Sequence, residues 1–323
     1  MDLILATSDG QEIGVLDYDL DIDLGGSNDF QIDLSYASWM DDIQMKRLVY
    51  IPGTEYGGII RYISSATNTG KIILKGYTWR GYLAHRFIRP GSGNDYYIAS
   101  GELNTIIRNL ISIPGFVVST DSTGITVSNY QFDRYCSVLD GLQAMLQTVG
   151  YRLDINYVQT QSGGYVYVQA VKAGLYGDTV EYSQDSMIDF SSTDDQMGVN
   201  HLICLGKGEL KNRLVVDLFA DKNGNISQTQ TITGINEITE VFENSGAEGE
   251  TLIETGKARL KEKQNKKTFT ASVKSVDTEL FIGDIVTGQD YITGNKMTKP
   301  IARKIVNRTN GVMSLDYKLE GES

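Results

Sequence analysis

Residues 16–24 alternate strictly between apolar and acidic side chains. The apolar positions are Leu16, Tyr18, Leu20, Ile22 and Leu24, and the acidic positions between them are Asp17, Asp19, Asp21 and Asp23. Successive side chains of an extended strand point to opposite faces, so the pattern predicts a strand with one apolar and one anionic face. Residues 30–36 repeat the alternation after a Gly-Gly-Ser-Asn turn at 25–28. Together the two runs predict a β-hairpin.

The rest of the first third of the chain also has the pattern of short strands. Apolar runs at 46–51, 58–64 and 71–78 are separated by turn residues. The whole chain has 34 Gly, 19 Tyr and only 4 Pro, a composition that favours many short strands joined by glycine turns. Strands at this spacing predict a small antiparallel barrel or sandwich.

The middle of the chain changes to helical spacing. Apolar residues recur at helical intervals over 102–111, where Ser100 is placed to cap the helix, and over 138–149, where Gly150 is placed to end it. A hairpin is predicted next, between 151–157 and 165–171.

Strand patterns return in the last third and enclose one helix. Strands are predicted at 199–205, 214–219, 269–276, 285–291, 299–307 and 312–318, and a helix at 248–263. The fold class expected is mainly β with an α+β insertion. We expect a β-rich barrel-like domain at 1–95, an α+β domain at 96–178, and a second β-rich barrel-like domain with one long helix at 179–323. We also expect that parts of the first and last of these segments can pack together.

Charge and composition exclude several classes of protein. The 323 residues carry a net charge of −12, the wrong sign for a general nucleic-acid binder or for attachment to an anionic membrane surface. The N-terminus lacks the pattern of a signal peptide, and no run approaches the roughly 20 apolar residues of a membrane span. We therefore expect a chain that is made in a cytoplasm.

Few residues along the chain have the pattern of a catalytic or metal-binding site. His85 and His201 are the only histidines, and neither has a second ligand at metal-binding spacing, so a structural role is expected for His201. Cys136 and Cys204 are expected to be free thiols in apolar surroundings. The alternating aspartates and the 221–225 segment imitate calcium loops but lack the required glycine. The sequence thus nominates no catalytic residue, no metal ligand and no cofactor.

Four segments carry a resemblance to a known group of proteins. They are Asp29-Phe30, the IPGTEYGGII run at 51–60, the GYTWRGYL run at 76–83 and the GVNHLICLGKGEL run at 198–210. In order and content they resemble the tail-hub proteins of long-tailed phages, in particular the tail-associated family of siphophages and prophages of Gram-positive bacteria. Such hubs are similar in fold to the central baseplate hub of contractile tails.

The resemblance implies a fold, partners and a location. It implies tail-tube-like barrel domains with smaller α+β domains, and a homotrimer that adapts the tail tube to its tip. The partners implied are the distal tail protein and the tail-tube protein, with a tail fibre or receptor-binding protein as a further one. Genomic DNA would pass without specific binding. The location implied is the virion tail, and the role is that of a non-enzymatic virion structural protein.

A negative channel wall would avoid the multi-phosphate contacts that make DNA binding tight. Asp17, Asp19, Asp21 and Asp23 are therefore the candidate lumen-facing strand, and an ordinary solvated sheet face is the alternative. Two other functions stay open. One is a tail-associated cell-wall hydrolase or peptidase subunit, which paired carboxylates in a cleft would favour. The other is a host-surface carbohydrate-binding module that uses Trp39 or Tyr96-Tyr97 as an aromatic platform.

Overall fold

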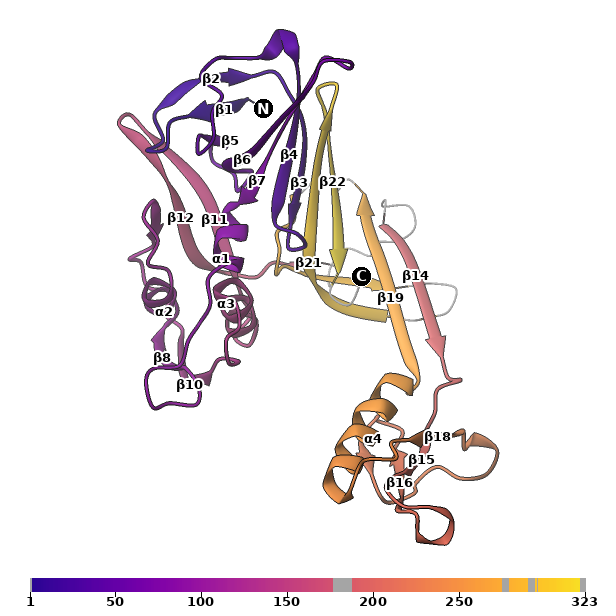
Figure 1. Cartoon of the computed structure of the whole chain (residues 1–323). Helices are drawn as coiled ribbons and strands as arrows, with labels where there is room; N and C mark the ends of the chain where they lie inside the picture. The colour runs from indigo at the N-terminus through magenta and orange to yellow at the C-terminus, as the bar shows by residue number, and fades with distance from the viewer. Residues whose placement is uncertain (1, 177–187, 275–278, 290–293, 295, 320–323) are drawn as a thin grey trace. The chain divides into compact units, whose positions relative to one another are not determined.

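The computed structural model of this chain describes residues 2–176, 188–274, 279–289, 294 and 296–319 (Figure 1). Its contacts divide it into two compact units. Unit 1 comprises Met1–Phe190 with Ala271–Ser323, and unit 2 comprises Ser191–Thr270. Unit 2 is thus an insertion in the sequence of unit 1. The domain boundaries expected at residues 95 and 178 stay a prediction.

Within the described residues, thirteen strands form one sheet (Figure 1). In order across it lie β14 (Ile188–Asp195), β19 (Lys266–Lys274), β22 (Val312–Leu319), β21 (Lys296–Thr309), β3 (Asp19–Leu24), β4 (Asp29–Ser35), β7 (Lys71–Thr78), β6 (Gly57–Ala66), β5 (Leu48–Tyr50), β1 (Leu3–Ala6) and β2 (Glu12–Leu16). Off this path, β20 (Ile285–Gln289) pairs with β21 and with β13 (Leu175–Tyr176). The antiparallel pairing of β21 with β3 joins the end of the chain to its beginning.

The hairpin predicted from the alternating pattern is confirmed, but its first strand is shorter than expected. β3 pairs antiparallel with β4, and Ile22 lies opposite Phe30. The run 16–24 is not one strand, because β2 ends at Leu16 and pairs with β1, whereas β3 begins at Asp19 and pairs with β4. Alternation marks which side chains are buried; it does not show where a strand changes its partner.

A group of helices and two small sheets completes unit 1. They are α1 (Trp79–Ala84), α2 (Leu103–Leu110), α3 (Val138–Gln147), the pair β8 (Ile98–Glu102) and β10 (Thr126–Gln131), and the sheet of β9 (Phe116–Val118), β11 (Tyr151–Thr160) and β12 (Gly163–Lys172). Both predicted helices and the predicted β11–β12 hairpin are present. A short 3-10 helix, Tyr36–Ser38, follows β4.

Two hydrophobic core clusters of described residues stabilise unit 1. One is formed by the apolar faces of β3, β4 and their neighbours. The other combines residues of β1 and β5 with α1, α2, α3, β11 and β12. At its centre Tyr157 stacks on Tyr50, with ring centroids 3.8 Å apart, and on Trp79 at 5.4 Å. Because this core takes residues from both sides of position 95, the helices are packed firmly against the sheet.

Unit 2 is a four-stranded sheet with one helix. The strand order is β17 (Ile226–Ser227), β16 (Val215–Ala220), β15 (His201–Leu205) and β18 (Thr239–Glu243), and the helix is α4 (Gly249–Lys263). Short 3-10 helices, Leu210–Asn212 and Gly234–Asn236, lie in its loops. Helix α4 matches the helix predicted at 248–263. Residues 275, 276, 290 and 291, the predicted ends of two strands, lie outside the described residues. The expected mainly-β fold with small helical insertions is confirmed.

Candidate functional site: the acidic sheet face

Five aspartates of the central strands β3 and β4 lie on the face of the sheet that points away from the core. We call this group the acidic sheet face; it consists of Asp19, Asp21, Asp23, Asp29 and Asp33. The apolar residues between them are buried, among them Leu20, Ile22, Phe30 and Ile32. Strand alternation therefore sends the aspartates to the opposite side of the strands. The predicted division into an apolar and an anionic face is confirmed for β3.

Asp17, the first predicted member, lies outside this strand. It stands between β2 and β3, is exposed, and its Oδ2 accepts a hydrogen bond from Ser38 Oγ at 3.5 Å. The structure therefore brings together three of the four predicted aspartates. It adds Asp29 and Asp33 from β4, of which only Asp33 belongs to the second alternating run.

The register concentrates negative charge on two adjacent strands. Asp19 lies opposite Asp33, and Asp21 lies opposite Gln31. On the β7 side, Tyr77 and Lys75 lie opposite Asp29 and Gln31. Like charges placed directly opposite each other repel and destabilise a sheet. The Asp19–Asp33 pair therefore has a cost in stability, for which the packing of the other face compensates.

Asp23 is the most constrained member of the face. Arg303 Nε donates to its Oδ1 at 2.7 Å and Arg303 Nη2 to its Oδ2 at 2.9 Å, while the Ser27 backbone N–H and Oγ each donate at 2.7 Å. Burial alone would raise the pKa of Asp23, but these bonds outweigh it and hold the pKa below the ordinary value. A Cβ on Gly26 would lie 2.5 Å from Asp23 Oδ2 and 2.6 Å from Arg303 Nε. A larger residue at position 26 would therefore push the Asp23 and Arg303 side chains out of this geometry.

The other aspartates of the face keep uncompensated charge. Burial raises the pKa of Asp21, and repulsion from Asp23 and Asp29 adds to the effect. Asp19 Oδ1 accepts from the Asn310 N–H at 2.8 Å, and Asp33 Oδ1 accepts from Gln31 Nε2 at 2.8 Å. Among the described residues, Asp23 alone of the five forms an ion pair. The face can therefore repel polyanions.

The remaining nominated residues are not members of this face. His201 is held between Glu237 and Asp217, with Nδ1 2.7 Å from Glu237 Oε1 and Nε2 2.8 Å from Asp217 Oδ1. The His85 ring contacts the Tyr77 ring in a tilted arrangement, with centroids 4.3 Å apart and an interplanar angle of 60°. Asp221 accepts from the backbone N–H groups of Asn223 and Asn225, and this confirms the predicted hairpin turn. Both cysteines are free thiols, as predicted.

The aromatic residues nominated for sugar binding also lie elsewhere. Trp39 lines a hollow of about 310 Å³ with Tyr36 and Ile63. Tyr96 and Tyr97 line another of about 520 Å³. Sugar binding at either position stays a prediction. In the part of the chain that the structure describes, no three His, Cys, Asp or Glu side chains form a group able to hold a metal ion. In the same part, no helix is long and apolar enough to span a membrane.

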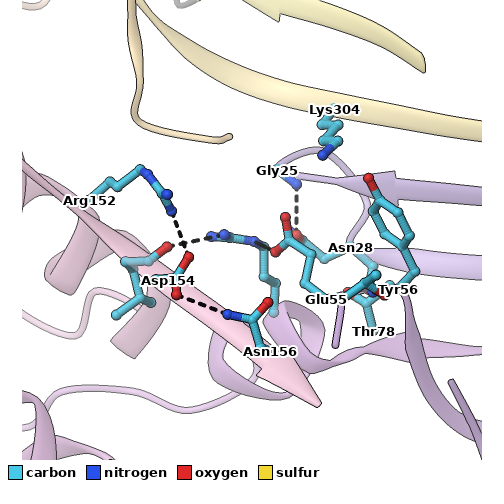
Figure 2. Close-up of polar contacts among 12 residues, drawn as sticks. Gly25, Asn28, Glu55, Tyr56, Thr78, Arg152, Asp154, Asn156 and Lys304 are labelled. Atoms are coloured by element: carbon cyan, nitrogen blue, oxygen red, sulfur yellow. Dashed lines mark hydrogen bonds and ion pairs between the residues drawn. The ribbon is translucent and has the colours of Figure 1, made fainter. Parts of the chain in front are cut away.

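A buried polar cluster in unit 1, formed by Glu55, Arg80 and the Leu153 carbonyl, was not predicted from the sequence. Arg80 Nε donates to Glu55 Oε2 at 2.7 Å and Arg80 Nη2 donates to the Leu153 carbonyl at 3.2 Å. Both side chains of the pair are almost fully buried. Glu55 of this cluster is labelled in Figure 2. The same view shows Asp154 between Arg152 and Asn156, which donate to it at 2.8 and 2.9 Å.

A second buried charge is Lys304, labelled in the same view (Figure 2). Its Nζ donates to Glu279 Oε1 at 2.6 Å. The ammonium group also lies 5.0 Å from the ring centroids of Tyr56 and Phe281. Glu55 and Arg80 belong to two of the four sequence runs quoted above, at 51–60 and 76–83. The sequence signal was therefore present, but nothing in it showed that the two runs meet.

Similarity to known proteins was found by comparison with solved structures. No protein-family model matches this chain, and no curated protein matches it. Two solved structures have TM-scores of 0.49 and 0.46. The first is the 43 kDa tail protein of prophage MuSo2 from Shewanella oneidensis, with 14% identity over 99% of this chain and 98% of the other. The second is a prophage tail protein from Listeria monocytogenes, with 12% identity over 100% and 96%.

A third solved structure has a higher TM-score than these two. It is a chain of the p2 virion baseplate in its activated conformation, with a TM-score of 0.50 and 10% identity over 100% of this chain and 99% of the other. The resemblance to phage tail proteins expected from the sequence is thus confirmed at the level of the fold. This chain has the fold of a phage baseplate protein.

Proposed function

We propose that this chain is a structural hub of a phage or prophage tail tip and that it has no enzymatic activity. Three copies form a ring that adapts the tail tube to the tip and closes or conducts the DNA channel. The observation that supports the proposal is the baseplate fold over the full length of the chain. The ring binds the distal tail protein and the tail-tube protein in the virion tail, and a tail fibre or receptor-binding protein is a further partner.

The acidic sheet face gives this proposal a physical mechanism. In the ring, Asp19, Asp21 and Asp33 face the channel. Phosphates that pass such a wall meet repulsion instead of the cationic contacts and counterion release that make binding tight. The wall therefore lets DNA slide without retaining it.

The ring is tested by co-expression with the tail-tube and distal tail proteins of the same genome. Native mass spectrometry of the purified complex is expected to show three copies of this chain. A complex with one copy, or no complex at all, contradicts the hub proposal.

The channel wall is tested by reversing its charge. The triple variant Asp19→Lys, Asp21→Lys, Asp33→Lys keeps the Asp23–Arg303 pair. It should assemble, bind double-stranded DNA with strongly salt-dependent affinity, and slow DNA ejection. A matched control changes the exposed Asp41, Asp42 and Asp95 to Lys and so alters the net charge equally. If the two triple variants behave alike, the acidic sheet face is not the wall.

A further inference from the structure

Among the described residues of unit 2, one face of the sheet is largely apolar and carries no helix. Helix α4 covers one face of its sheet, where Leu202, Cys204 and Leu218 are buried. Alternation sends the neighbouring side chains to the other side. We call that side the open face; its apolar members are Ile203, Leu205, Val215, Phe219 and Val241.

The open face is contiguous and accessible. Ile203 lies beside Val241 on one neighbouring strand, and Leu205 lies beside Val215 on the other. The side chains of Val215 and Val241 are 49% and 56% exposed. The sheet of unit 2 is mixed, since β15 pairs parallel with β18 and antiparallel with β16. Contiguous exposed apolar surface marks an interaction site.

Negative charge lies on the open face and around it, because Asp217 stands between Val215 and Phe219 on β16, opposite Ile203. Asp217 and Glu237 hold His201 between them, and its ring stacks on Phe219 with centroids 4.3 Å apart. Glu243 pairs with Arg213 at the other end. A partner that fits this surface needs apolar or aromatic groups at its centre and cationic groups around them.

Unit 1 presents a surface of that chemistry. Arg61, Tyr77, Tyr82, His85 and Arg86 line a hollow of about 410 Å³, which we call the basic–aromatic hollow. Its lining contains no carboxylate, although the chain as a whole has a net charge of −12. Phe87, next in sequence, is 55% exposed.

The two arginines of the hollow differ in their surroundings. Arg61 Nε donates to Tyr82 Oη at 3.1 Å, and its guanidinium lies 5.9 Å from the centroid of the Tyr82 ring. Within the described residues, the Arg86 guanidinium has neither a hydrogen bond nor an ion pair. It is available to a carboxylate from outside the chain.

We propose that the open face of unit 2 in one copy of this chain binds the basic–aromatic hollow of unit 1 in a second copy. The two surfaces match in charge and in apolar character, and every copy carries both. Such a contact is head-to-tail, and head-to-tail contacts close into rings when the rotation between copies allows it. Ring closure rests on the proposed function, whereas the pairwise contact does not.

The test breaks one surface in each of two full-length variants, Val241→Lys and Arg86→Glu. Sedimentation equilibrium should show that the wild-type chain self-associates and that each variant does so at least tenfold more weakly. A mixture of the two variants still contains one intact pair of surfaces. It should therefore form a 1:1 dimer that does not grow with concentration.

Controls separate this contact from general effects of charge. Val312→Lys places the same substitution at another exposed valine, and Arg134→Glu reverses another exposed arginine; both should associate like the wild type. If Val241→Lys does not fold, as judged by circular dichroism, Val215→Lys replaces it.

Three outcomes of the sedimentation experiments overturn the proposal. The first is a wild-type chain that stays monomeric up to about 1 mM, the weak end of the affinity scale. The second is that the variants associate as strongly as the wild type. The third is that the mixture of variants associates no more strongly than each variant alone. A trimer with the tail-tube protein that tolerates both variants overturns this contact and leaves the hub proposal intact. If the two variants form a dimer when mixed, but the wild-type chain forms no trimer with the tail-tube protein, the contact is supported and the hub proposal is contradicted.

Discussion

Two aspartates of one strand show how neighbouring carboxylates acquire opposite properties. Asp23 meets a guanidinium fork and two donors from Ser27, so its pKa lies below 3.8. Asp21, two residues earlier on the same face, is partly desolvated beside two other aspartates, so its pKa lies above that value. At neutral pH the first charge stabilises the fold and the second costs stability.

We predict opposite effects for the two amide substitutions. Asp23→Asn should lower the free energy of unfolding at pH 7 by about 1.5–3 kcal/mol, because it removes charge-assisted hydrogen bonds. A depressed pKa gives stability above the unfolded pKa and loses it as the pH falls through the folded value, so this deficit should disappear in acid.

Asp21→Asn is the matched control on the same strand. It should raise stability at pH 7 by less than about 1 kcal/mol, because it removes repulsion at an exposed position. Its effect should fade as the pH falls below 3.8, the ordinary pKa of an aspartate, because Asp21 is then increasingly protonated in both states. Urea unfolding at pH 7 and pH 3 measures both effects. Equal signs for the two variants would contradict the assignment.

At the scale of elements, helix α2 begins with a cap that the sequence pattern misplaced. Ser100 was the predicted cap, but it lies in β8, and its Oγ accepts from the Asn129 N–H at 2.8 Å. The N-cap is Glu102, whose Oε2 accepts from the Thr105 N–H at 3.0 Å. Its Oε1 accepts from Thr123 at 2.8 Å. One carboxylate thus starts the helix and fixes the loop before β10.

We predict that Glu102→Ala lowers the free energy of unfolding by about 1–2 kcal/mol, the usual cost of a lost N-cap. Amide hydrogen exchange should accelerate at Thr105 and Thr123. Ser100→Ala is the control, and it should accelerate exchange at Asn129 while leaving Thr105 unchanged. Faster exchange at Thr105 in the Ser100 variant would restore the cap assigned from the sequence.

At the scale of the whole molecule, each unit depends on its own core. Arg80 and Glu55 form a buried pair in unit 1. In unit 2, Gly256 of α4 packs so closely on the sheet that a Cβ would lie 2.6 Å from Cys204 Sγ and 2.7 Å from Leu218 Cδ1. Because the sites share no core residues, their effects should stay within their own units.

We predict separate responses to one substitution in each unit. Arg80→Met should destabilise unit 1 by about 3–5 kcal/mol, because Glu55 stays buried without its partner. Gly256→Ala should destabilise unit 2 by about 1–3 kcal/mol through overpacking. Hydrogen exchange followed by mass spectrometry should show faster exchange only in the altered unit. Equal acceleration across both units would show that they unfold as one.

Periodicity located most elements of this fold. The alternation in β3 and β4 and the helical spacing of α2 and α3 indicated which side chains are buried, because burial follows the repeat of each element. The end of β2 at Leu16 and the start of β3 at Asp19 could not be recognised in the sequence, because apolar and acidic residues alternate across both strands and across the residues between them. For the acidic sheet face, the sequence supplied the residues of each strand but not their register.

The sequence by itself determined the local structure of this protein, the sign of its charge and the two faces of its hairpin. These properties depend on neighbours within a few positions along the chain. Only the tertiary structure decided that β21 pairs with β3, which places Arg303 on Asp23, and that the runs containing Glu55 and Arg80 meet in one core. These partners lie tens to hundreds of positions apart. Which distant strands pair depends on packing and topology, which no local pattern records.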